Sequence, residues 1–390
     1  MKTPNTNTLD QAGANGSSTK PEGKSFGSQG AAARRPLAVA VIGCGYWGPN
    51  LIRNFALIPT CDLKAVCDLS PTRLDHVRRL FPTVDGFSDH NELLRRDDID
   101  AVVVATPVRY HFPIAKAALL AGKHVLIEKP MASSVEECEE LIAIAEKQGR
   151  ILMIGHTFLY SEPVHKMNQI ISSGDLGEIC YINSQRLNLG LFQKDINVAW
   201  DLAPHDLSII LHILGESPLT VNCQGNAHIT KGIEDVTNIS LTFPNKRFAT
   251  IQSSWLEPRK VRAMTIVGTK RMIVYNDVEP LEKIKVYDVR VDRPPHYDSF
   301  AEFHYSYHYG DSYIPRLEQR EPLREQCQHF LDCIEKGNQP LTSGHSGLEL
   351  VRILEASSES LRNSGAPVQL GARKAPPLET VGGQGAPCAA

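Results

Sequence analysis

The sequence predicts an α/β protein with two folded domains, the first built on a doubly wound parallel sheet and the second an α+β domain with a large, mostly antiparallel open sheet. Three observations support this prediction. Apolar strands alternate with helical segments up to about residue 155, strands dominate the region that follows, and 390 residues are ample for two hydrophobic cores.

The composition excludes several classes of protein. The 41 Lys and Arg residues nearly balance the 44 Asp and Glu residues, for a net charge of −3, whereas binding a phosphate backbone or membrane surface needs a concentrated positive face. No apolar run approaches the ~18–20 residues that span a bilayer, and the N-terminus has no apolar segment typical of a secretory signal. The nine cysteines are odd in number and form no C-x-x-C pair. We therefore expect a reduced, cytoplasmic protein without disulfides or bound metal and with no nucleic-acid or membrane partner.

Both ends of the chain differ in composition from the middle. Residues 1–35 contain one Leu and one Phe among small and polar residues, and residues 371–390 are rich in Gly, Pro and Ala. Such segments bury too little apolar surface to offset the entropy of an ordered chain. We predict disordered tails at 1–35 and 371–390, a first domain at 36–155 and a second domain at 156–370.

The first domain alternates between strands and helices. Its opening segment, LAVAVIG, is a continuous apolar run typical of a strand buried on both faces. Ser70 and Pro71 suit the start of a helix, and Ser134 and Glu137 have capping-box spacing. This order implies a parallel sheet with right-handed crossovers. The predicted strands are 37–43, 61–67, 98–106, 124–128 and 150–155, with a weaker one near 84–87, and the predicted helices are 48–58, 71–80, 111–123 and 135–148.

Strands dominate beyond Gly155. Turn residues at Pro244–Asn245 and Gly268–Thr269 separate neighbouring apolar segments, as expected for an antiparallel meander. A sheet face left uncovered by helices usually pairs with another subunit, so we expect a homodimer or homotetramer. The predicted strands are 178–190, 219–225, 236–243, 247–255, 264–269 and 271–275, and the predicted helices are 162–173, 201–215, 320–336 and 346–363.

A glycine motif follows the first strand. Gly43, Gly45 and Gly48 form G-x-G-x-x-G between a buried strand and a helix. In that context the glycines allow a tight turn, close approach of the backbone to a pyrophosphate and close helix–strand packing, while the helix N-terminus binds phosphate. The motif predicts an NAD(P)-binding Rossmann domain.

Four residues near this motif are candidates for contact with the dinucleotide, and two of them bear on the choice between NAD and NADP. Asp68 ends the second strand twenty residues after Gly48, where a carboxylate hydrogen-bonds the adenosine ribose and repels a 2′-phosphate. Asp68 therefore favours NAD, whereas Arg73 nearby could pair with the phosphate of NADP or stack on adenine. Tyr46 and Trp47, inside the loop, either contact the dinucleotide or pack on the domain seam.

Two further segments carry residues suited to proton transfer. Lys129 follows Glu128 at the carboxyl end of a predicted strand, where parallel sheets bind ligands, although a lysine before a proline turn can also be a plain surface residue. Asp201 and His205 lie four residues apart, so on a helix they share one face and could form an oriented base. Spacing alone leaves open a structural alternative, with Asp201 as a helix N-cap and His205 merely polar.

The ordered chain, roughly 37–370, resembles the glucose–fructose oxidoreductase / inositol dehydrogenase / rhizopine catabolism (Gfo/Idh/MocA) family. The shared segments are GCGYWG, ATPVRYHFPIAKAALLAGKHVLIEKP and DLAPHD. The resemblance implies an NAD(P)-dependent oxidoreductase acting on CH–OH groups of sugars, cyclitols or nucleotide sugars. Many members have glycines just before the first aspartate of the segment that matches DLAPHD, whereas this chain has NVAWD there. Together with GYWGPN, this segment looks most like members that act at C3 of nucleotide-linked sugars.

The resemblance also implies roles for individual residues. Lys129 matches the lysine of the E-K-P motif, and Asp201 and His205 match the D-x-x-x-H pair. In the oxidising direction His205 would remove a hydroxyl proton, Lys129 would stabilise the substrate oxygen and Asp201 would orient His205, although either Lys129 or His205 could transfer the proton. In the family a T-P-x-x-x-H segment lines the dinucleotide, and Thr106, Pro107 and His111 match it. Glu128, next to Lys129, is a further candidate for contact with the dinucleotide.

Other polar residues near the predicted crevice are candidates for binding substrate. Arg186 and Asn188 alternate on one strand and so point to one face, and Asn197 and Tyr160 lie in adjoining segments. His156 follows the last strand of the first domain, where we expect a structural histidine with satisfied hydrogen bonds rather than a catalyst.

The segment FHYSYHYG at 303–310 contains two histidines but no cysteine or carboxylate to complete a zinc site, so an edge strand or a subunit contact is expected there.

The sequence therefore predicts an NAD-dependent oxidoreductase of a sugar or nucleotide sugar, with NADP left open. Two alternatives remain at this point: a free-cyclitol (inositol-type) dehydrogenase, and a non-catalytic dinucleotide-binding sensor. The combination of Lys129, Asp201 and His205 favours an enzyme, because a sensor has no need to keep all three.

Overall fold

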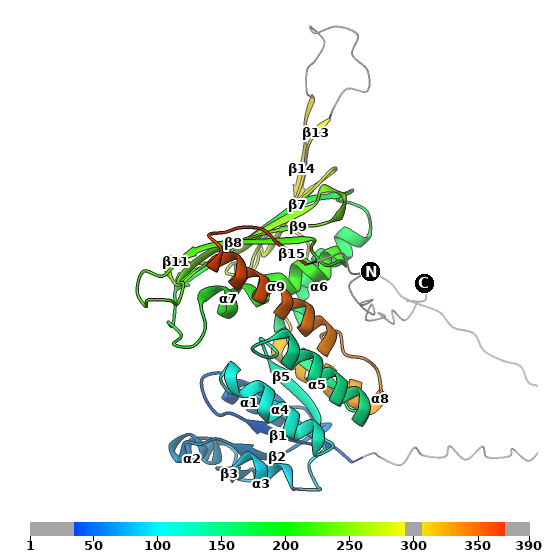
Figure 1. Cartoon of the computed structure of the whole chain (residues 1–390). Helices are drawn as coiled ribbons and strands as arrows, with labels where there is room; N and C mark the ends of the chain where they lie inside the picture. The colour runs from blue at the N-terminus through cyan, green and yellow to red at the C-terminus, as the bar shows by residue number, and fades with distance from the viewer. Residues whose placement is uncertain (1–34, 293–305, 371–390) are drawn as a thin grey trace, which may run out of the picture. The chain divides into compact units, whose positions relative to one another are not determined.

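The computed structural model describes residues 35–292 and 306–370, and two sheets organise this part of the chain (Figure 1). The predicted tails lie outside the described residues except for Arg35. The strands are β1 (Leu37–Ile42), β2 (Cys61–Cys67), β3 (Asp85–Phe87), β4 (Ala101–Val104), β5 (His124–Glu128), β6 (Leu152–Gly155), β7 (Ile179–Leu189), β8 (Thr220–Asn226), β9 (Val236–Thr242), β10 (Phe248–Ser254), β11 (Leu256–Gly268), β12 (Met272–Asn276), β13 (Ile284–Asp292), β14 (Ser306–Tyr313) and β15 (Val368–Gln369).

The helices follow the predicted alternation in the first half and cover the second sheet in the other half. They are α1 (Gly48–Ala56), α2 (Pro71–Leu80), α3 (His90–Leu94), α4 (His111–Leu120), α5 (Val135–Gln148), α6 (Glu162–Ser172), α7 (Val198–Leu214), α8 (Pro322–Lys336) and α9 (Gly344–Arg362), with short 3-10 turns η1 (Val108–Tyr110), η2 (Thr157–Tyr160) and η3 (Pro244–Lys246).

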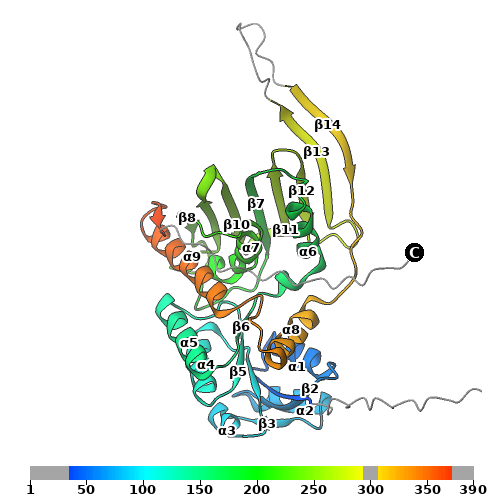
Figure 2. The ribbon, with the colours of Figure 1, turned by 90° about the vertical axis from the view of Figure 1, so that its right-hand side faces the viewer.

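The first sheet is parallel throughout, with the strand order β3-β2-β1-β4-β5-β6. This is the Rossmann order, and it confirms the predicted fold class. Successive residues of β1 point to opposite faces, so Val39 and Val41 pack with α1 and Ala40 and Ile42 with α4 and α5. Figure 2 shows α4 and α5 on one side of the sheet and α1 and α8 on the other.

The second sheet has nine strands in the order β14-β13-β12-β11-β7-β10-β9-β8-β15. Every neighbouring pair is antiparallel except β7 and β10, which run parallel, so the predicted mostly antiparallel sheet is confirmed. Helices α6, α7 and α9 lie along one face (Figure 1). The other face carries a polar hollow of about 360 Å³ lined by residues that include Asn183, Gln185, Asn238 and Gln252.

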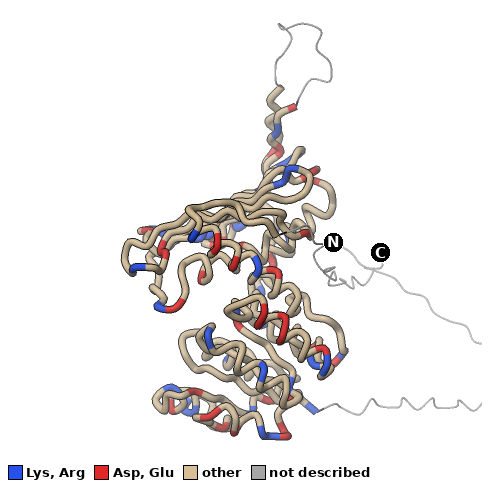
Figure 3. The backbone as a smooth tube through the Cα atoms, viewed as in Figure 1, with Lys and Arg blue, Asp and Glu red and all other residues tan. Residues whose placement is uncertain are grey.

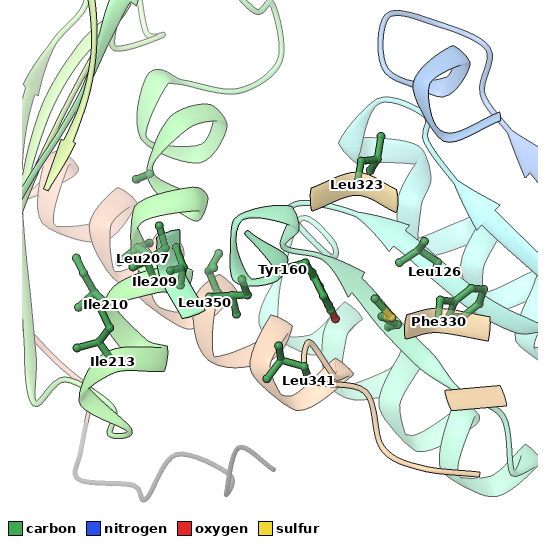
Figure 4. Packing of buried hydrophobic residues seen from close by; sticks show 14 of the residues in the cluster. Leu126, Tyr160, Leu207, Ile209, Ile210, Ile213, Leu323, Phe330, Leu341 and Leu350 are labelled. Atoms are coloured by element: carbon green, nitrogen blue, oxygen red, sulfur yellow. The ribbon is translucent and has the colours of Figure 1, made fainter. Parts of the chain in front are cut away.

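One buried cluster links the two sheets. Leu126 of β5 and Phe330 of α8 belong to the same cluster as Leu207 of α7 and Leu350 of α9, with Tyr160 between them (Figure 4). This continuous apolar packing holds the end of β5 near α7, where the predicted functional residues lie.

The hairpin of β13 and β14 extends from the end of the second sheet (Figure 1). β14 is the last strand in the order, so the predicted edge strand is confirmed for its described residues; His304 lies outside them. Tyr307 pairs with Val291 and Tyr309 with Val289, whereas His308 pairs with Arg290 on the opposite face.

Lys and Arg residues are interspersed with Asp and Glu residues along the described chain (Figure 3). None of the helices between residues 35 and 370 that the structure describes is both long and apolar enough to cross a membrane.

Candidate active site

The glycine loop has the geometry that the motif predicts. Gly43 has a φ of +103°, and a Cβ there would lie 2.5 Å from the carbonyl oxygen of Ala105. A Cβ on Gly48 would lie 1.9 Å from the carbonyl oxygen of Gly43, so only glycine allows this close packing of helix and strand. Among the residues that the structure describes, only the Arg73 side chain lies within 4 Å of such a Cβ on Gly45, which leaves the backbone open to a ligand. These features fit the pyrophosphate of a dinucleotide at the start of α1.

Asp68 ties the glycine loop to the start of α2. Its Oδ2 accepts a hydrogen bond from the amide of Cys44 at 2.7 Å, and its Oδ1 accepts one from the amide of Ser70 at 2.8 Å. The Arg73 guanidinium lies 3.6 Å from the same Oδ2. A carboxylate has about four lone-pair positions, so Asp68 keeps the capacity to accept ribose hydroxyls as well.

Asp68→Asn is expected to weaken the preference for NAD over NADP. The amide keeps the shape of the side chain but removes the negative charge and releases Arg73 to pair with a 2′-phosphate. The ratio of kcat/KM for NADP⁺ to that for NAD⁺ should rise about tenfold, as expected for ~1.4 kcal/mol of altered electrostatics. Steady-state kinetics with both dinucleotides measures this ratio, with Asp75→Asn on the exposed side of α2 as the control. An unchanged ratio would mean that Asp68 does not discriminate between them.

Trp47 and Glu128, both predicted at the cofactor site, contact each other. The Trp47 Nε1–H donates to Glu128 Oε1 at 2.9 Å, and the backbone N–H of Lys129 donates to Glu128 Oε2 at 3.3 Å. Burial raises the pKa of Glu128 to about 7. Tyr46, by contrast, is 84% exposed.

His111 is buried and connects two strand ends. Its Nδ1 lies 2.8 Å from the Pro130 carbonyl oxygen and its Nε2 lies 2.7 Å from the Thr106 carbonyl oxygen. The ring therefore links the end of β4 to the turn that carries Lys129. The hydroxyl of Thr106 is buried with no hydrogen-bond partner among the described residues, so its hydrogen-bonding capacity is free for a ligand. Pro107 comes directly before the η1 turn.

Lys129 reaches across to α7. Its Nζ donates to the backbone carbonyl of Asp201 at 2.7 Å and lies 3.4 Å from Asp201 Oδ1, with 18% of the lysine side chain exposed. The Lys129–Pro130 peptide bond is cis. The end of β5 and the first turn of α7 thus bring together two of the three predicted catalytic residues.

Asp201 lies inside α7, not at its N-cap. The cap is Asn197, whose side chain accepts a hydrogen bond from the Trp200 amide at 3.2 Å. Asp201 Oδ2 instead accepts a hydrogen bond from the indole N–H of the buried Trp255 at 3.1 Å. The helical interpretation of the D-x-x-x-H spacing is therefore correct and the N-cap alternative is wrong.

His205 lies one turn beyond Asp201 and is kept neutral by its surroundings. Burial, and then the nearby Lys129 and Arg186 charges, hold the pKa of His205 well below its usual value. Its Nδ1 has no hydrogen-bond partner among the described residues, and its ring packs edge-on against Phe158 with centroids 5.0 Å apart. The expected contact with Asp201 is not seen, because both Asp201 oxygens are held by other side chains, so Phe158 orients the His205 ring.

Arg186 supports this arrangement from β7. Its Nε donates to Asp206 Oδ2 at 2.6 Å in an ion pair whose two side chains are each 4% exposed. The guanidinium lies over the Phe158 ring, 4.6 Å from its centroid. Arg186 thus holds Phe158 against His205, whereas Asn188 lies two residues further along the same face of β7 and is half-buried.

Two predicted substrate residues have structural partners instead. Tyr160 is buried, and its hydroxyl hydrogen-bonds Thr342 at 2.9 Å. Asn197 caps α7 and also donates to Glu234 at 2.7 Å. The structure therefore places Tyr160 in the core and Asn197 at the start of α7.

Sequence reasoning did not single out three residues that build the site: Phe158, Trp255 and Asp206. Asp206 stands in the DLAPHD segment, and Trp255 ends a predicted strand. No sequence signal pairs either residue with its partner, since each contact joins segments more than fifteen residues apart.

Comparisons with known proteins agree with this geometry. A family model described as "Oxidoreductase family, NAD-binding Rossmann fold" matches residues 37–156, and the GFO/IDH/MocA C-terminal domain model matches residues 164–274. UDP-N-acetylglucosamine 3-dehydrogenase of Acidithiobacillus ferrooxidans is 32% identical over 243 residues, which cover 60% of this chain and 72% of that protein. The uncharacterized oxidoreductase YrbE of Bacillus subtilis is 25% identical over 348 residues, covering 86% of this chain and 97% of that one.

Solved structures show the same fold. A levoglucosan dehydrogenase in complex with NADH and levoglucosan superposes with a TM-score of 0.74 at 21% identity, covering 86% of this chain and 100% of that chain. An aldose–aldose oxidoreductase from Caulobacter crescentus gives a TM-score of 0.73 at 23% identity over the same shares. Matched by both family models, the chain belongs to the Gfo/Idh/MocA family of NAD-binding oxidoreductases.

Proposed function

We propose that this protein transfers a hydride between NAD and a hydroxyl-bearing carbon of a sugar, with C3 of a nucleotide-linked sugar as the preferred position. The observation that carries the proposal is the contact of Lys129 with Asp201, which brings an ammonium group to the helix that also holds a neutral His205. In this proposal residues 36–155 bind the dinucleotide and residues 156–370 bind the sugar. NAD, when bound, supplies the hydride acceptor or donor.

Lys129 is suited to hold the reacting oxygen. An ammonium group has three N–H donors, and two of them point to the carbonyl and carboxylate oxygens of Asp201. The third is available to the substrate oxygen, where a positive charge stabilises the negative charge that develops during oxidation.

His205 is suited to accept the proton in the same step. A neutral imidazole has one nitrogen lone pair, and the Nδ1 of His205 has no hydrogen-bond partner in the described part of the chain. Asp201, held by Trp255, keeps Lys129 beside the ring. In the reducing direction the protonated His205 returns the proton to the sugar oxygen.

Support for a nucleotide-linked substrate comes from β11. Leu256 pairs with Leu189 and Val261 with Leu187, so the residues between them bulge opposite the end of β7. This bulge carries Arg259 and Lys260, both exposed, and cationic side chains of this kind bind the diphosphate of a nucleotide sugar. The name of the relative that acts on UDP-N-acetylglucosamine points to the same class.

The uncovered polar face of the nine-stranded sheet supports a homodimer or homotetramer. Its hollow is lined by side chains of β7, β8, β9 and β10 that could hydrogen-bond a second copy of the chain.

The test is turnover of NAD⁺, followed at 340 nm, against UDP-N-acetylglucosamine, dTDP-glucose, glucose and myo-inositol. We expect reduction with a nucleotide sugar, and a higher KM for it but not for a free sugar in an Arg259→Ser/Lys260→Ser variant. Turnover of myo-inositol without turnover of either nucleotide sugar would contradict the proposal in favour of a cyclitol dehydrogenase. Binding of NADH without turnover of any of the four compounds would favour a sensor.

A further inference from the structure

His156 occupies the position next to Lys129 at the carboxyl edge of the first sheet. Glu128 of β5 pairs with Gly155 of β6, so Lys129 and His156 are the next residues of two neighbouring parallel strands. Gly155 allows this closeness, since a Cβ there would lie 3.0 Å from the Glu128 carboxyl group. The loop that His156 begins also contains Phe158, which packs on His205. His156 therefore lies beside the proposed catalytic residues Lys129 and His205.

The hydrogen-bonding groups of this ring have no partner. His156 is 2% exposed, and neither its Nδ1 nor its Nε2 has a hydrogen bond to any described residue. Buried polar groups in folded proteins are almost always satisfied, and each exception calls for a ligand or an ordered water. No described residue therefore satisfies the ring, in contrast to the expected structural histidine with satisfied hydrogen bonds.

Two further buried polar groups also lack partners. The hydroxyl of Thr106 lies just after β4, and the His205 ring on α7 is close enough for His156 to act on its charge. The Thr106 hydroxyl and the His205 Nδ1 are both buried without a hydrogen bond to the described residues. His156 and His205, two rings with unsatisfied nitrogens on separate elements, lie close to the Lys129 ammonium and together suit a ligand rich in hydroxyls.

The charge state of His156 suits a hydroxyl. Burial, with the Lys129 charge as a second cause, lowers its pKa to about 3, so the ring is neutral near pH 7. A neutral imidazole offers one N–H donor and one nitrogen acceptor, and a sugar hydroxyl can both accept and donate.

We propose that His156 is a substrate-binding residue that hydrogen-bonds a second hydroxyl of the sugar, next to the oxygen held by Lys129. This inference rests on the proposed sugar oxidoreductase function and extends it by one residue. The ligand class is a polyol with neighbouring hydroxyl groups, free or nucleotide-linked.

The experiment compares His156→Leu and His156→Asn with the wild-type protein. Leu removes both polar atoms at similar volume, so the melting temperature of the ligand-free protein should stay the same or rise. With the sugar that the wild type turns over fastest among the four compounds named above, kcat/KM should fall about 5- to 100-fold. Asn, with a donor and an acceptor, should recover part of this loss, and the Kd for NADH should change less than twofold in both variants.

His212→Leu is the matched control. His212 lies two turns beyond His205 on α7, and its Nδ1 is also buried without a partner among the described residues, but Lys129 is not among the charges that act on it. This variant should leave kcat/KM unchanged.

Several outcomes would overturn the inference. A lower melting temperature with unchanged kcat/KM in His156→Leu would show that the ring serves packing alone. A tenfold weaker Kd for NADH with an unchanged KM for sugar would assign the ring to the nicotinamide.

Failure of the proposed function gives a different result: the wild-type protein turns over only free polyols or none of the four compounds. Free-polyol turnover still tests His156 with that polyol. If none of the compounds is turned over, the melting temperature of His156→Leu decides. A value below that of the wild type overturns the role of His156, and an unchanged or higher value supports it.

Discussion

Lys129→Met is expected to lower kcat by ~10²–10⁴-fold while NADH still binds. Methionine keeps much of the length of the side chain but removes the charge that contacts Asp201 and, in our proposal, the substrate oxygen. The glycine loop and Asp68 lie at the other end of the dinucleotide site, so NADH affinity should change little. Single-turnover reduction of NAD⁺ and NADH fluorescence titration measure the two effects separately.

The control is Lys116→Met. Lys116 forms an exposed ion pair with Glu140 that links α4 to α5, away from the site, and exposed pairs contribute little to stability. Its replacement should leave kcat unchanged. Near-normal turnover in Lys129→Met would remove this lysine from the chemistry, whatever the geometry of the glycine loop.

Breaking the buried ion pair of Arg186 and Asp206 is expected to cause the largest loss of stability. In Arg186→Met the Asp206 carboxylate stays buried without its cation, which lowers the free energy of unfolding by about 3–5 kcal/mol. Phe158 also loses the guanidinium above its ring, so kcat should fall as the His205 ring loses its support. Urea unfolding and steady-state kinetics measure the two effects.

The double variant Arg186→Met/Asp206→Leu separates the buried charge from the lost packing. If the cost lies in the uncompensated carboxylate, the double variant is more stable than Arg186→Met alone, because apolar side chains often replace a buried ion pair without loss. Its kcat should stay low, since Phe158 remains unsupported. Equal stability of the single and double variants would place the cost in packing instead.

Much of the part of the chain that forms the parallel sheet could be predicted because its signals are local. The run LAVAVIG became β1, the capping pair Ser134 and Glu137 begins α5, and the glycine motif has the turn that its residues require. In α5 the Ser134 side chain accepts from the Glu137 amide at 3.2 Å. Each of these features depends on residues within a few positions of one another, so the linear pattern contains the information.

The nine-stranded sheet was predicted in outline, with gaps where strand pairing joins distant segments of the chain. The parallel neighbours β7 and β10 are separated by α7 and two other strands, and no local pattern shows their contact. The hairpin of β13 and β14 was predicted only as an edge strand near 303–310. Its partner strand β13 was not identified, because the pairing of the two strands joins separate segments of the chain, although Ile284 and Val286 of β13 are buried in the core.

The sequence by itself determined the dinucleotide-binding fold, the family and the catalytic candidates Lys129, Asp201 and His205, because short motifs encode turns, helix faces and strand ends. Only the tertiary structure decided what those side chains contact: Asp201 holds Lys129 and accepts from Trp255, Phe158 orients His205, and His156 is left without a partner. The physical reason is that hydrogen bonds and burial depend on residues brought together by packing from distant parts of the chain, and spacing along the sequence does not specify them.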